Sequence, residues 1–492
     1  MSQRLQKKRN TVLFLSLLFF SLIGPLVFWL GNRGEQVSSQ ARGPQLPTLP
    51  APAQRANSDE AKFGGLFNSI NSKPIQKRIS LGNKVLVTAD NSPDKQAGVQ
   101  AFSSGNFTTA VNMFSSSLQM NRNDPEAWIY LNNATAAGNA NVLKIAVSVP
   151  IGGNLNVARE ILRGVAQAQY EVNHNGGIGG TMVQVEIAND DNDPAIAKQI
   201  ATEFVNDASI LAVVGHNSSD ASIAAAPVYQ QGGLVMISPT SVARNLSGIG
   251  SYIFRTTPST RVIAHTLARY AIKSARKIKI AVCADSQAQA SLSFQEEFTS
   301  AMSENGGKVT YTACDFSAPN FNPSDIPSQA ISDGAQGLLL APSVDKINQA
   351  IEVARANKGR LALLGSHTLY TFETLQQGQV DTNGMMLPVV WHPAAIPGNS
   401  FAASARKFWG GSGSWRTAMA YDATNAVITG LKSGLNREQL QKALSNSGFS
   451  VIGATGPIQF LPSGDRNGAA ILVKVKPGQT SGTGYDFVPF LP

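Results

Sequence analysis

The pattern of apolar positions is clearest between residues 142 and 189, where it predicts one strand–helix–strand unit. Val142–Pro150 is an almost continuous apolar run, which is typical of a strand buried on both faces of a parallel sheet. Ala158–Asn173 repeats apolar residues at helical spacing, and the glycine-rich Asn175–Gly180 ends that helix. Met182–Ala188 is the second strand. Because a crossover of this kind joins parallel strands, we predict a parallel α/β sheet.

The loop Ile151–Asn156, between the first strand and its helix, is a candidate wall of a ligand site. Ligands of open parallel sheets bind beyond the carboxyl ends of the strands, which is where this loop is expected. An ordinary solvent-facing loop explains its polar sequence equally well, so both interpretations stand.

The alternation of strands and helices continues to the C-terminus. Strands are predicted at Ile210–His216, Leu234–Pro239, Lys277–Asp285, Lys308–Cys314, Gly337–Pro342 and Leu361–Ser366. Helices are predicted at Ser218–Gly233, Thr260–Ala275, Ser291–Asn305, Lys346–Asn357, Ala418–Leu435 and Arg437–Ser445, ahead of a β-rich tail. Because roughly 350 residues of one pattern exceed a single small sheet, we predict two lobes.

A run without charged residues, Thr11–Leu30, lies near the start of the chain. It is long enough to cross a hydrocarbon core of about 30 Å as a helix. Basic residues precede it at Arg4, Lys7, Lys8 and Arg9. We therefore predict an uncleaved single-pass anchor over residues 1–31 in the cell inner membrane, with the main domain in the periplasm or outside the cell. A cleaved signal peptide is the alternative.

Residues 32–141 are predicted to connect this anchor to the main domain. Residues 32–62 are rich in proline and read as an extended linker, and Lys77–Val87 weakly suggests a short strand. Residues 63–141 are expected to be mainly helical, and the periodicity over 98–135 predicts a helical hairpin followed by a further helix at Pro125–Ala134. This hairpin resembles a tetratricopeptide repeat at its small, aromatic and proline landmarks, Gly105, Phe107, Ala110, Phe114 and Pro125. It is either a docking surface for a partner or a spacer packed on the main domain.

Short motifs follow one another along residues 142–492. They include IAVSVPIGG, NGGIGG, VEIANDDNDP, AVVGHNSSDAS, LVMISPTS, IFRTTPS, KIKIAVCADS, LLGSHTLY, TAMAYDATNAVITGL and GATGPIQFLPSGDR. Together they resemble the type I periplasmic binding proteins, in particular the leucine/branched-chain amino acid-binding family of substrate-binding proteins for ABC transporters. Each motif alone is weak, and the order of all of them carries the resemblance.

The resemblance implies an α/β fold of two lobes with parallel sheets, which close on a ligand by a hinge. The first lobe would comprise about 142–256 and 387–456, and the second about 257–386 and 457–492. The chain would cross between them near Phe254–Thr257, Met385–Val390 and Gly456–Phe460.

The resemblance also implies a set of ligand-binding residues. Ser219 matches a serine that meets a ligand carboxylate at a helix start, where free N–H groups favour an anion. Thr240 and the adjacent Ser241 belong to a segment whose backbone meets the ligand head group. The remaining cleft positions are Asn154, Asn156 and Val157 from the loop of the first lobe, and Gln289, Ser343 and His367 from the second lobe.

Three departures from the family pattern bear on the ligand. Val242 replaces a hydroxyl residue, Gln289 and Ser343 replace aromatic residues, and His367 replaces the acid that pairs with a ligand ammonium. A buried ammonium needs a charged or well-placed acceptor, and neutral histidine supplies one acceptor at most. We therefore expect a small anion, an amide or a neutral polar solute rather than an ordinary α-amino acid, or a pocket that has lost binding. The alternative for His367 is a strand-end residue unrelated to ligand.

Charge and chemistry exclude several classes of protein. The net charge is +9, but outside the N-terminal cluster the basic residues are dispersed, so we expect no nucleic-acid partner. The histidines show no metal-ligand spacing and no cofactor or nucleophile motif is present, so we expect no metal, no cofactor and no enzyme. The acidic run Asp190–Asp193 is interpreted as a solvated strand end rather than a calcium loop. Cys283 and Cys314 are expected to be free buried thiols, with a disulfide as the alternative.

Taken together, the sequence predicts a membrane-tethered solute-binding protein that captures a small-molecule ligand and delivers it to an ABC permease or another membrane protein. The competing hypothesis is a membrane-anchored sensor or scaffold, in which the helical hairpin docks a partner and ligand in the cleft alters that docking.

Overall fold

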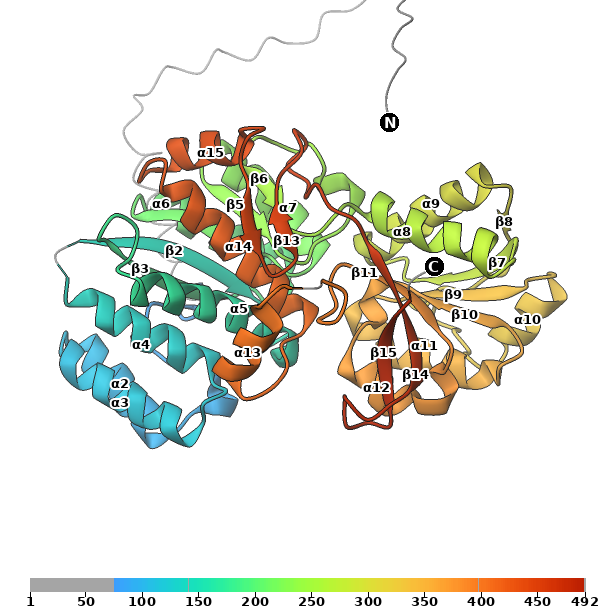
Figure 1. Cartoon of the computed structure of the whole chain (residues 1–492), viewed down its shortest axis with the longest axis horizontal. Helices are drawn as coiled ribbons and strands as arrows, with labels where there is room; N and C mark the ends of the chain where they lie inside the picture. Colours follow the sequence, from blue (N-terminus) through green and yellow to red (C-terminus); the bar gives the residue numbers. More distant parts are fainter. Residues whose placement is uncertain (1–74, 140, 397, 491–492) are drawn as a thin grey trace, which may run out of the picture. The chain divides into compact units, whose positions relative to one another are not determined.

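Two β-sheets form the framework of the computed structural model, which describes residues 75–139, 141–396 and 398–490. One sheet has six strands in the order β1-β3-β2-β4-β5-β6, and the other has seven in the order β15-β14-β11-β10-β9-β7-β8. Each sheet is the centre of one lobe, and Figure 1 shows the two lobes beside each other. The α/β two-lobed fold predicted from the sequence is therefore confirmed.

The sheet of the first lobe is covered by helices on both faces. Its strands are β1 (Ile79–Ser80), β2 (Val142–Val149), β3 (Met182–Asn189), β4 (Ile210–Val214), β5 (Val235–Ser238) and β6 (Ile253–Arg255). The helices of this lobe are α5 (Leu155–His174), α6 (Pro194–Asn206), α7 (Ser219–Gln231), α13 (Phe401–Trp409), α14 (Trp415–Leu431) and α15 (Arg437–Ser445), with the hairpin β12 (Val451–Gly453) and β13 (Gly456–Ile458). Apolar side chains of α5 and α14 pack on one face of the sheet, and those of α6 and α7 pack on the other.

The second lobe repeats this layered plan. Its strands are β7 (Lys279–Ala284), β8 (Lys308–Val309), β9 (Gly337–Ala341), β10 (Ala362–Gly365), β11 (Met386–Val389), β14 (Ile471–Pro477) and β15 (Tyr485–Phe490). Its helices are α8 (Thr260–Arg269), α9 (Gln289–Glu304), α10 (Ile326–Ser332), α11 (Ile347–Asn357) and α12 (Phe372–Gly378). Helices α8 and α9 cover one face, while α10, α11 and α12 cover the other.

Both sheets are mixed rather than purely parallel, which corrects the prediction of parallel sheets. Strand β1 pairs antiparallel with β3, and β14 pairs antiparallel with both β11 and β15. Strands β14 and β15 form a hairpin, which needs no crossover helix and therefore runs antiparallel. The helix-connected strands β2 to β6 and β7 to β11 pair in parallel.

The close packing of α5 on α14 fixes the centre of the first lobe. Helix α5 begins at the N-cap Asn154, whose side chain accepts a hydrogen bond from the backbone N of Val157. A Cβ at Gly164 would lie 2.3 Å from the carbonyl oxygen of Thr417 on α14, so only glycine allows the two backbones to approach this closely.

The chain passes between the lobes after β6, after β11 and again after Arg466. The third passage lies beyond the predicted Gly456–Phe460, because that stretch folds back on the first lobe. Phe460 pairs with Arg466, and the backbone N of Asn467 donates to the carbonyl of Gln459. The carboxylates of Asp422 and Asp465 hold this loop to the first lobe through Arg466 and Arg255 respectively.

The segment before the main domain forms three helices, α2 (Pro93–Ser103), α3 (Phe107–Met120) and α4 (Pro125–Ala137), which confirms the predicted helical hairpin and the further helix at Pro125–Ala134. The ammonium of the buried Lys95 lies 2.7 Å from the carboxylates of both Asp124 and Glu126. Asn133 of α4 exchanges hydrogen bonds with the backbone of Val185 in β3, at 2.7 and 2.8 Å. Helix α4 therefore lies against the first lobe, between α3 and α5 (Figure 1), as the spacer hypothesis expects.

The strand predicted at Lys308–Cys314 is wrong beyond Val309. Strand β8 is the edge strand of its sheet, and Tyr311 is fully exposed. No neighbouring strand lies on its outer side to keep the residues after Val309 in a regular strand. Within the predicted strand Lys77–Val87, the structure has the two-residue strand β1 (Ile79–Ser80). The predicted membrane anchor, Thr11–Leu30, and the linker 32–62 lie outside the described residues. Among the described helices, none is both long and apolar enough to cross a membrane.

Cys283 and Cys314 form a disulfide, which corrects the expectation of free thiols. The backbone N of Ala284 donates to the carbonyl of Cys314, so the two segments run side by side. This register brings the two Cα atoms to 4.6 Å, within the range that a disulfide spans. The positions of the cysteines along their own strands do not reveal this register, which is why the sequence favoured the wrong state.

Candidate ligand-binding site

A cleft of about 410 Å³ lies between the two lobes. It is lined by loops that follow β3, β4 and β5 in the first sheet and β7, β9 and β10 in the second, together with the start of α14. These loops are at the carboxyl ends of parallel strands, where α/β folds bind their ligands. Of the site residues expected from the sequence, those that line the cleft are Ser219, Thr240, Ser343 and His367.

The hydroxyls of the first-lobe wall are engaged within the wall itself. Ser219 begins α7, and its Oγ accepts hydrogen bonds from the backbone N of Val242 at 3.2 Å and of Ala243 at 3.1 Å. Thr240 Oγ1 donates to the carbonyl of Asn217 at 2.8 Å. Ser241 is buried behind this wall, where its Oγ lies 2.7 Å from the Oγ of Ser222. These hydroxyls are therefore already hydrogen-bonded to other groups of the same wall.

The other expected residues stand apart from the cleft lining. Asn154 caps α5, and Asn156 is exposed on the first turn of that helix. The loop before them is tied to the acidic segment after β3, because Gly152 N donates to Asp191 Oδ1 at 2.8 Å. Gln289 begins α9, and its backbone N lies 3.4 Å from Asp220 Oδ1 across the two lobes. The structure therefore groups Gln289 near the cleft and separates the two asparagines from it.

Arg416, at the start of α14, is a lining residue that sequence reasoning missed. Its side chain is 6% exposed, and its guanidinium carbon lies 4.5 Å above the ring of Trp415. Burial lowers the pKa of Arg416 to about 10, although Glu160 opposes this shift, so the group stays charged at neutral pH. Among the described residues, Arg416 Nε and Trp415 Nε1 are buried without a hydrogen-bond partner.

A capping signal near the start of α14 could have revealed these two residues. Ser414 accepts from the backbone N of Thr417, and Thr417 Oγ1 accepts from the backbone N of Ser414, which makes a capping box. The helix therefore begins three residues before the predicted Ala418, and Trp415 and Arg416 are helical rather than part of a loop.

His367 lies at the inner end of the second-lobe wall. Its ring packs between those of Phe294 and Trp415, with centroid distances of 6.2 and 6.0 Å. Burial, together with the charge of Arg416, lowers the pKa of His367 to about 4. The imidazole is therefore neutral at pH 7. Its Nδ1 has no partner within the described part of the chain.

Carboxylates also face the cleft, on the side of α7 and of the loop after β7. Burial and the neighbouring Asp285 raise the pKa of Asp220. Asp285 itself accepts hydrogen bonds from Gln287 N at 3.0 Å and from Ser317 Oγ at 2.7 Å. The cleft thus has an acidic side near α7 and a basic side at Arg416.

The acidic segment after β3 is a solvated strand end only in part: Asp193 is exposed as predicted, whereas Asp190 is buried, which corrects the prediction for that residue. Asp190 is fully buried, where its Oδ2 accepts from Ser148 Oγ at 2.9 Å and lies 2.7 Å from His216 Nδ1. Asp193 caps α6, and Asp191 pairs with Arg78 at 2.5 Å. No group of three metal-ligating side chains occurs in the described ranges, here or elsewhere.

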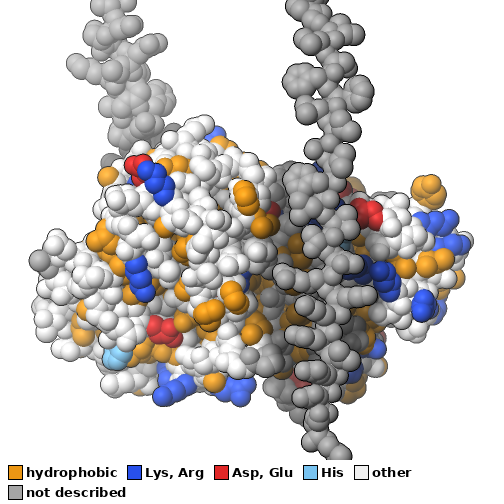
Figure 2. Space-filling view, turned by 45° about the horizontal axis from the view of Figure 1, so that its top comes forward, with side chains coloured by type: hydrophobic (Ala, Val, Ile, Leu, Met, Phe, Trp, Pro, Cys, Tyr) orange, Lys and Arg blue, Asp and Glu red, His pale blue; other side chains and the backbone are white. Residues whose placement is uncertain are grey.

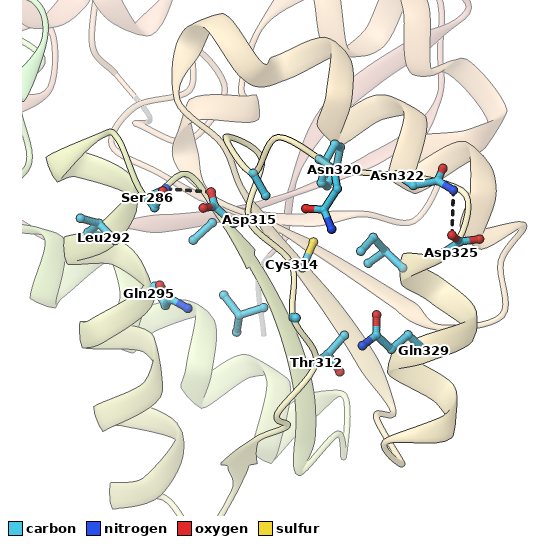
Figure 3. A pocket seen from close by; sticks show the side chains of 16 residues that line it. Ser286, Leu292, Gln295, Thr312, Cys314, Asp315, Asn320, Asn322, Asp325 and Gln329 are labelled. Carbon is cyan, nitrogen blue, oxygen red and sulfur yellow. Dashed lines mark hydrogen bonds between the residues drawn. The ribbon is translucent and has the colours of Figure 1, made fainter.

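A second hollow, of about 620 Å³, opens at the edge of the second sheet beside Cys314 (Figure 3). In Figure 3, Ser286 bonds Asp315 on one side and Asn322 bonds Asp325 on the other. None of the site residues expected from the sequence lines this hollow. The cleft between the lobes is therefore the better candidate site.

Basic side chains outside the cleft do not gather into one surface on the face drawn in Figure 2. Lys and Arg stand there in small separate groups between neutral and apolar side chains. A nucleic-acid surface needs a continuous basic stripe or patch, and the part of this face that grey atoms leave visible in Figure 2 shows none.

Stability is expected to depend on pH through His367. The pKa of His367 in the folded chain is about 4, which is below the ordinary value of about 6.5. Between these two pH values His367 is protonated in the unfolded chain but not in the folded chain. The stabilisation is present above pH 6.5 and is lost as the pH falls toward 4. We expect the wild-type chain to lose about 3 kcal/mol of unfolding free energy over this window through His367 alone.

Urea unfolding of His367→Gln at several pH values measures this loss. The difference between wild type and variant should change by about 3 kcal/mol from pH 7 to pH 4, because the other titrating groups cancel in the difference. One such group is Asp422, whose pKa burial raises to about 6. The exposed His174, replaced by glutamine, is the matched control and should keep the wild-type profile. A His367→Gln profile parallel to wild type would contradict the prediction.

Known proteins resemble this chain in both sequence and structure. A sequence model described as periplasmic binding protein matches residues 142–480. A Leu/Ile/Val-binding protein of Escherichia coli is 31% identical over 147 residues, which are 30% of this chain and 40% of that protein. An amino acid binding protein of Pseudomonas aeruginosa is 34% identical over 103 residues, which are 20% of this chain and 28% of that protein. The sequence matches thus span less than half the length of these relatives.

Solved structures extend the likeness to the whole two-lobed region. A leucine binding protein from Thermotoga maritima has a TM-score of 0.62 at 20% identity, over 71% of this chain and 99% of that chain. A solute binding protein from R. palustris in complex with 4-hydroxybenzoate has a TM-score of 0.63 at 14% identity, over 71% of this chain and 96% of that chain. At these identities the likeness establishes the fold.

Proposed function

This chain belongs to the periplasmic binding protein family, and we propose that it captures a small polar solute and delivers it to an ABC permease. The family consists of solute-binding proteins rather than enzymes, in agreement with the expectation from the sequence. The mechanism would be capture in the cleft and closure of the two lobes about their three connecting segments, without covalent chemistry.

The cleft itself is the observation that supports this function best. Its volume of about 410 Å³ lies within the range of small-molecule sites, and both lobes contribute to its lining. A solute in it would touch Ser219 and Thr240 on one side and Ser343 and His367 on the other, so binding would favour the closed state.

The class of solute is narrower than the names of the relatives suggest. The curated relatives are amino acid-binding proteins, while a structural neighbour binds 4-hydroxybenzoate. In this chain neutral His367 offers a ligand ammonium at most one acceptor. We therefore propose a polar solute whose ammonium, if it carries one, is not bound at His367 as the family pattern implies; Asp220 and Asp285, on the acidic side of the cleft, would be the carboxylates that accept it.

The chain would act outside the cytoplasm. The disulfide between Cys283 and Cys314 is typical of an oxidising compartment, such as the periplasm. We propose that Thr11–Leu30 tethers the protein to the inner membrane, because a tether raises the effective concentration of the receptor at its permease.

Native mass spectrometry of the full chain, purified without refolding in a mild detergent, tests the function. We expect a co-purified small molecule, or a rise in thermal stability with one member of a panel of amino acids, amides and small organic acids. A ligand at 100 times its dissociation constant adds about 2.7 kcal/mol to the free energy of unfolding. A folded, monodisperse chain that retains and binds none of these would contradict the proposal.

A further inference from the structure

We infer that the captured solute carries an acidic group and that Arg416 binds this group in the cleft. The inference rests on the proposed solute-binding function and assigns to it a class of ligand and a recognition residue. Neither the relatives nor the family motifs quoted above point to Arg416.

The first step is the state of the Arg416 side chain. It lines the cleft, is 94% removed from solvent, and has no hydrogen-bond partner for Nε among the described residues. A guanidinium has five N–H donors and no acceptor, so burial without partners is unfavourable. Buried charges in proteins are normally paired, and this one faces a cavity that a small molecule can enter.

The second step concerns the nearest acid of the chain. Glu160 is the only charge that acts on the pKa of Arg416, yet no ion pair joins the two side chains in the described structure. Glu160 instead accepts from Ser414 N at 3.1 Å, from Thr417 Oγ1, and from Arg163. Its carboxylate is therefore already engaged at the base of α14.

The acids that line the cleft, Asp220, Asp285 and Asp345, do not neutralise Arg416 either, because none of them acts on its pKa or forms an ion pair with it in the described ranges. Asp285 is held by Gln287 and Ser317, and the pKa of Asp220 responds to burial and Asp285 rather than to Arg416. The positive charge is thus left for a ligand.

The third step is the chemistry around the guanidinium. Trp415 Nε1 supplies a second buried donor that lacks a described partner, and its ring stacks under the guanidinium. The neighbouring His367 is neutral, so it adds no charge of either sign. A planar carboxylate fits the guanidinium fork through two parallel hydrogen bonds. The matched amide has one acceptor oxygen and an NH₂ group that would face N–H donors, so the site should reject it.

The inference is tested by calorimetric titration of the full chain, in the same mild detergent, with three matched pairs of acid and amide. The probes are 4-hydroxybenzoate and 4-hydroxybenzamide, isovalerate and isovaleramide, and leucine and leucinamide. We expect at least one acid to bind and its amide to bind on the order of 100-fold more weakly. Replacing Arg416 by methionine should weaken the acid by a similar factor, while Arg416→Lys should recover part of the affinity.

Two controls separate loss of binding from loss of structure. Arg416→Met removes a buried charge without a described partner, so the ligand-free variant should unfold at the same or a higher temperature than wild type. Arg269→Met removes an exposed charge from α8, away from the cleft, and should leave the affinity for the acid unchanged. If Arg416→Met unfolded at a lower temperature than wild type, the guanidinium would have a stabilising partner in the ligand-free chain, and this would contradict the inference.

The outcomes distinguish the inference from the proposed function. Binding of an amide or neutral probe with equal or higher affinity than its acid would overturn the inference and leave the function standing. If an acid binds and Arg416→Met does not weaken its binding, the inference is likewise overturned and the function is left standing. A folded wild-type chain that carries no co-purified molecule and binds none of the six probes would overturn both.

Discussion

Replacing Arg255 by methionine is expected to lower the free energy of unfolding by about 3 to 5 kcal/mol. The guanidinium is 2% exposed, and its Nε donates to Asp465 Oδ1 at 2.6 Å. Its other nitrogens donate to the carbonyl of Ala243 at 2.8 Å and to Ser247 Oγ at 2.6 Å. Methionine would leave the buried Asp465 without its counter-ion and two acceptors without a donor.

Urea unfolding of the full chain, followed by tryptophan fluorescence, measures this loss. The control is Arg244→Met, which breaks a pair with Glu296 whose side chains are 61% and 57% exposed, and should change stability by less than about 1 kcal/mol. Adding Asp465→Leu to Arg255→Met should restore part of the stability, because no unpaired charge then remains. Equal, small effects of Arg255→Met and Arg244→Met would show that the buried pair is not needed.

Removal of the disulfide has the second largest expected effect. Cys283 and Cys314 are separated by 31 positions in the sequence, and a crosslink over a loop of this length stabilises a fold by about 3 to 4 kcal/mol. Replacing both cysteines by alanine should lower the stability by about this amount, mainly through the unfolded chain, which gains conformational freedom.

The same unfolding experiment, with and without a reducing agent, checks the origin of the loss. The chain has two cysteines in all, so reduction should destabilise the wild type and leave the double-alanine variant unchanged. If the variant and the oxidised wild type unfolded at the same urea concentration, the crosslink would contribute nothing to stability.

The elements that local sequence patterns predicted best are those with long apolar runs. Val142–Pro150 became β2, and the helical spacing within Ala158–Asn173 lies inside α5. Both elements are buried along most of their length, so their apolar periodicity is set by the core and is visible without the fold. Element β8 is short because it lies at an edge, and an edge strand is defined by a neighbour that the local pattern does not reveal.

Pairings between distant residues were the features that the sequence concealed. Cys283 meets Cys314 only because of the register after β8, and Asp190 is buried only because His216 and Ser148 lie opposite it. Both were assigned by their local surroundings, one to free thiols and the other to solvent. In each case the partner comes from another part of the chain.

The candidate site shows the same division. Ser219 was predicted because it matches a serine of the family that the sequence resembles, and the structure places it at the start of α7 on the cleft. Arg416 was overlooked because the predicted helix began at Ala418; the capping box of Ser414 and Thr417 could have placed it on α14, but no local signal shows that its side chain is buried. Arg416 is a candidate because it is buried against Trp415 and because its Nε has no hydrogen-bond partner among the described residues. Both are properties of the folded chain.

The attachment of α2–α4 and β1 to the first lobe has a mechanical consequence. Strand β1 joins the edge of the first sheet at Ile79 and Ser80, and α4 is bonded to β3 through Asn133. A tether ahead of residue 75 would therefore fix the position of the first lobe, and the second lobe would be the one that rotates about the hinge segments. A pulling force on the tether would act on the first sheet and not on the three hinge segments. Closing and opening of the lobes would therefore not require the anchor to move.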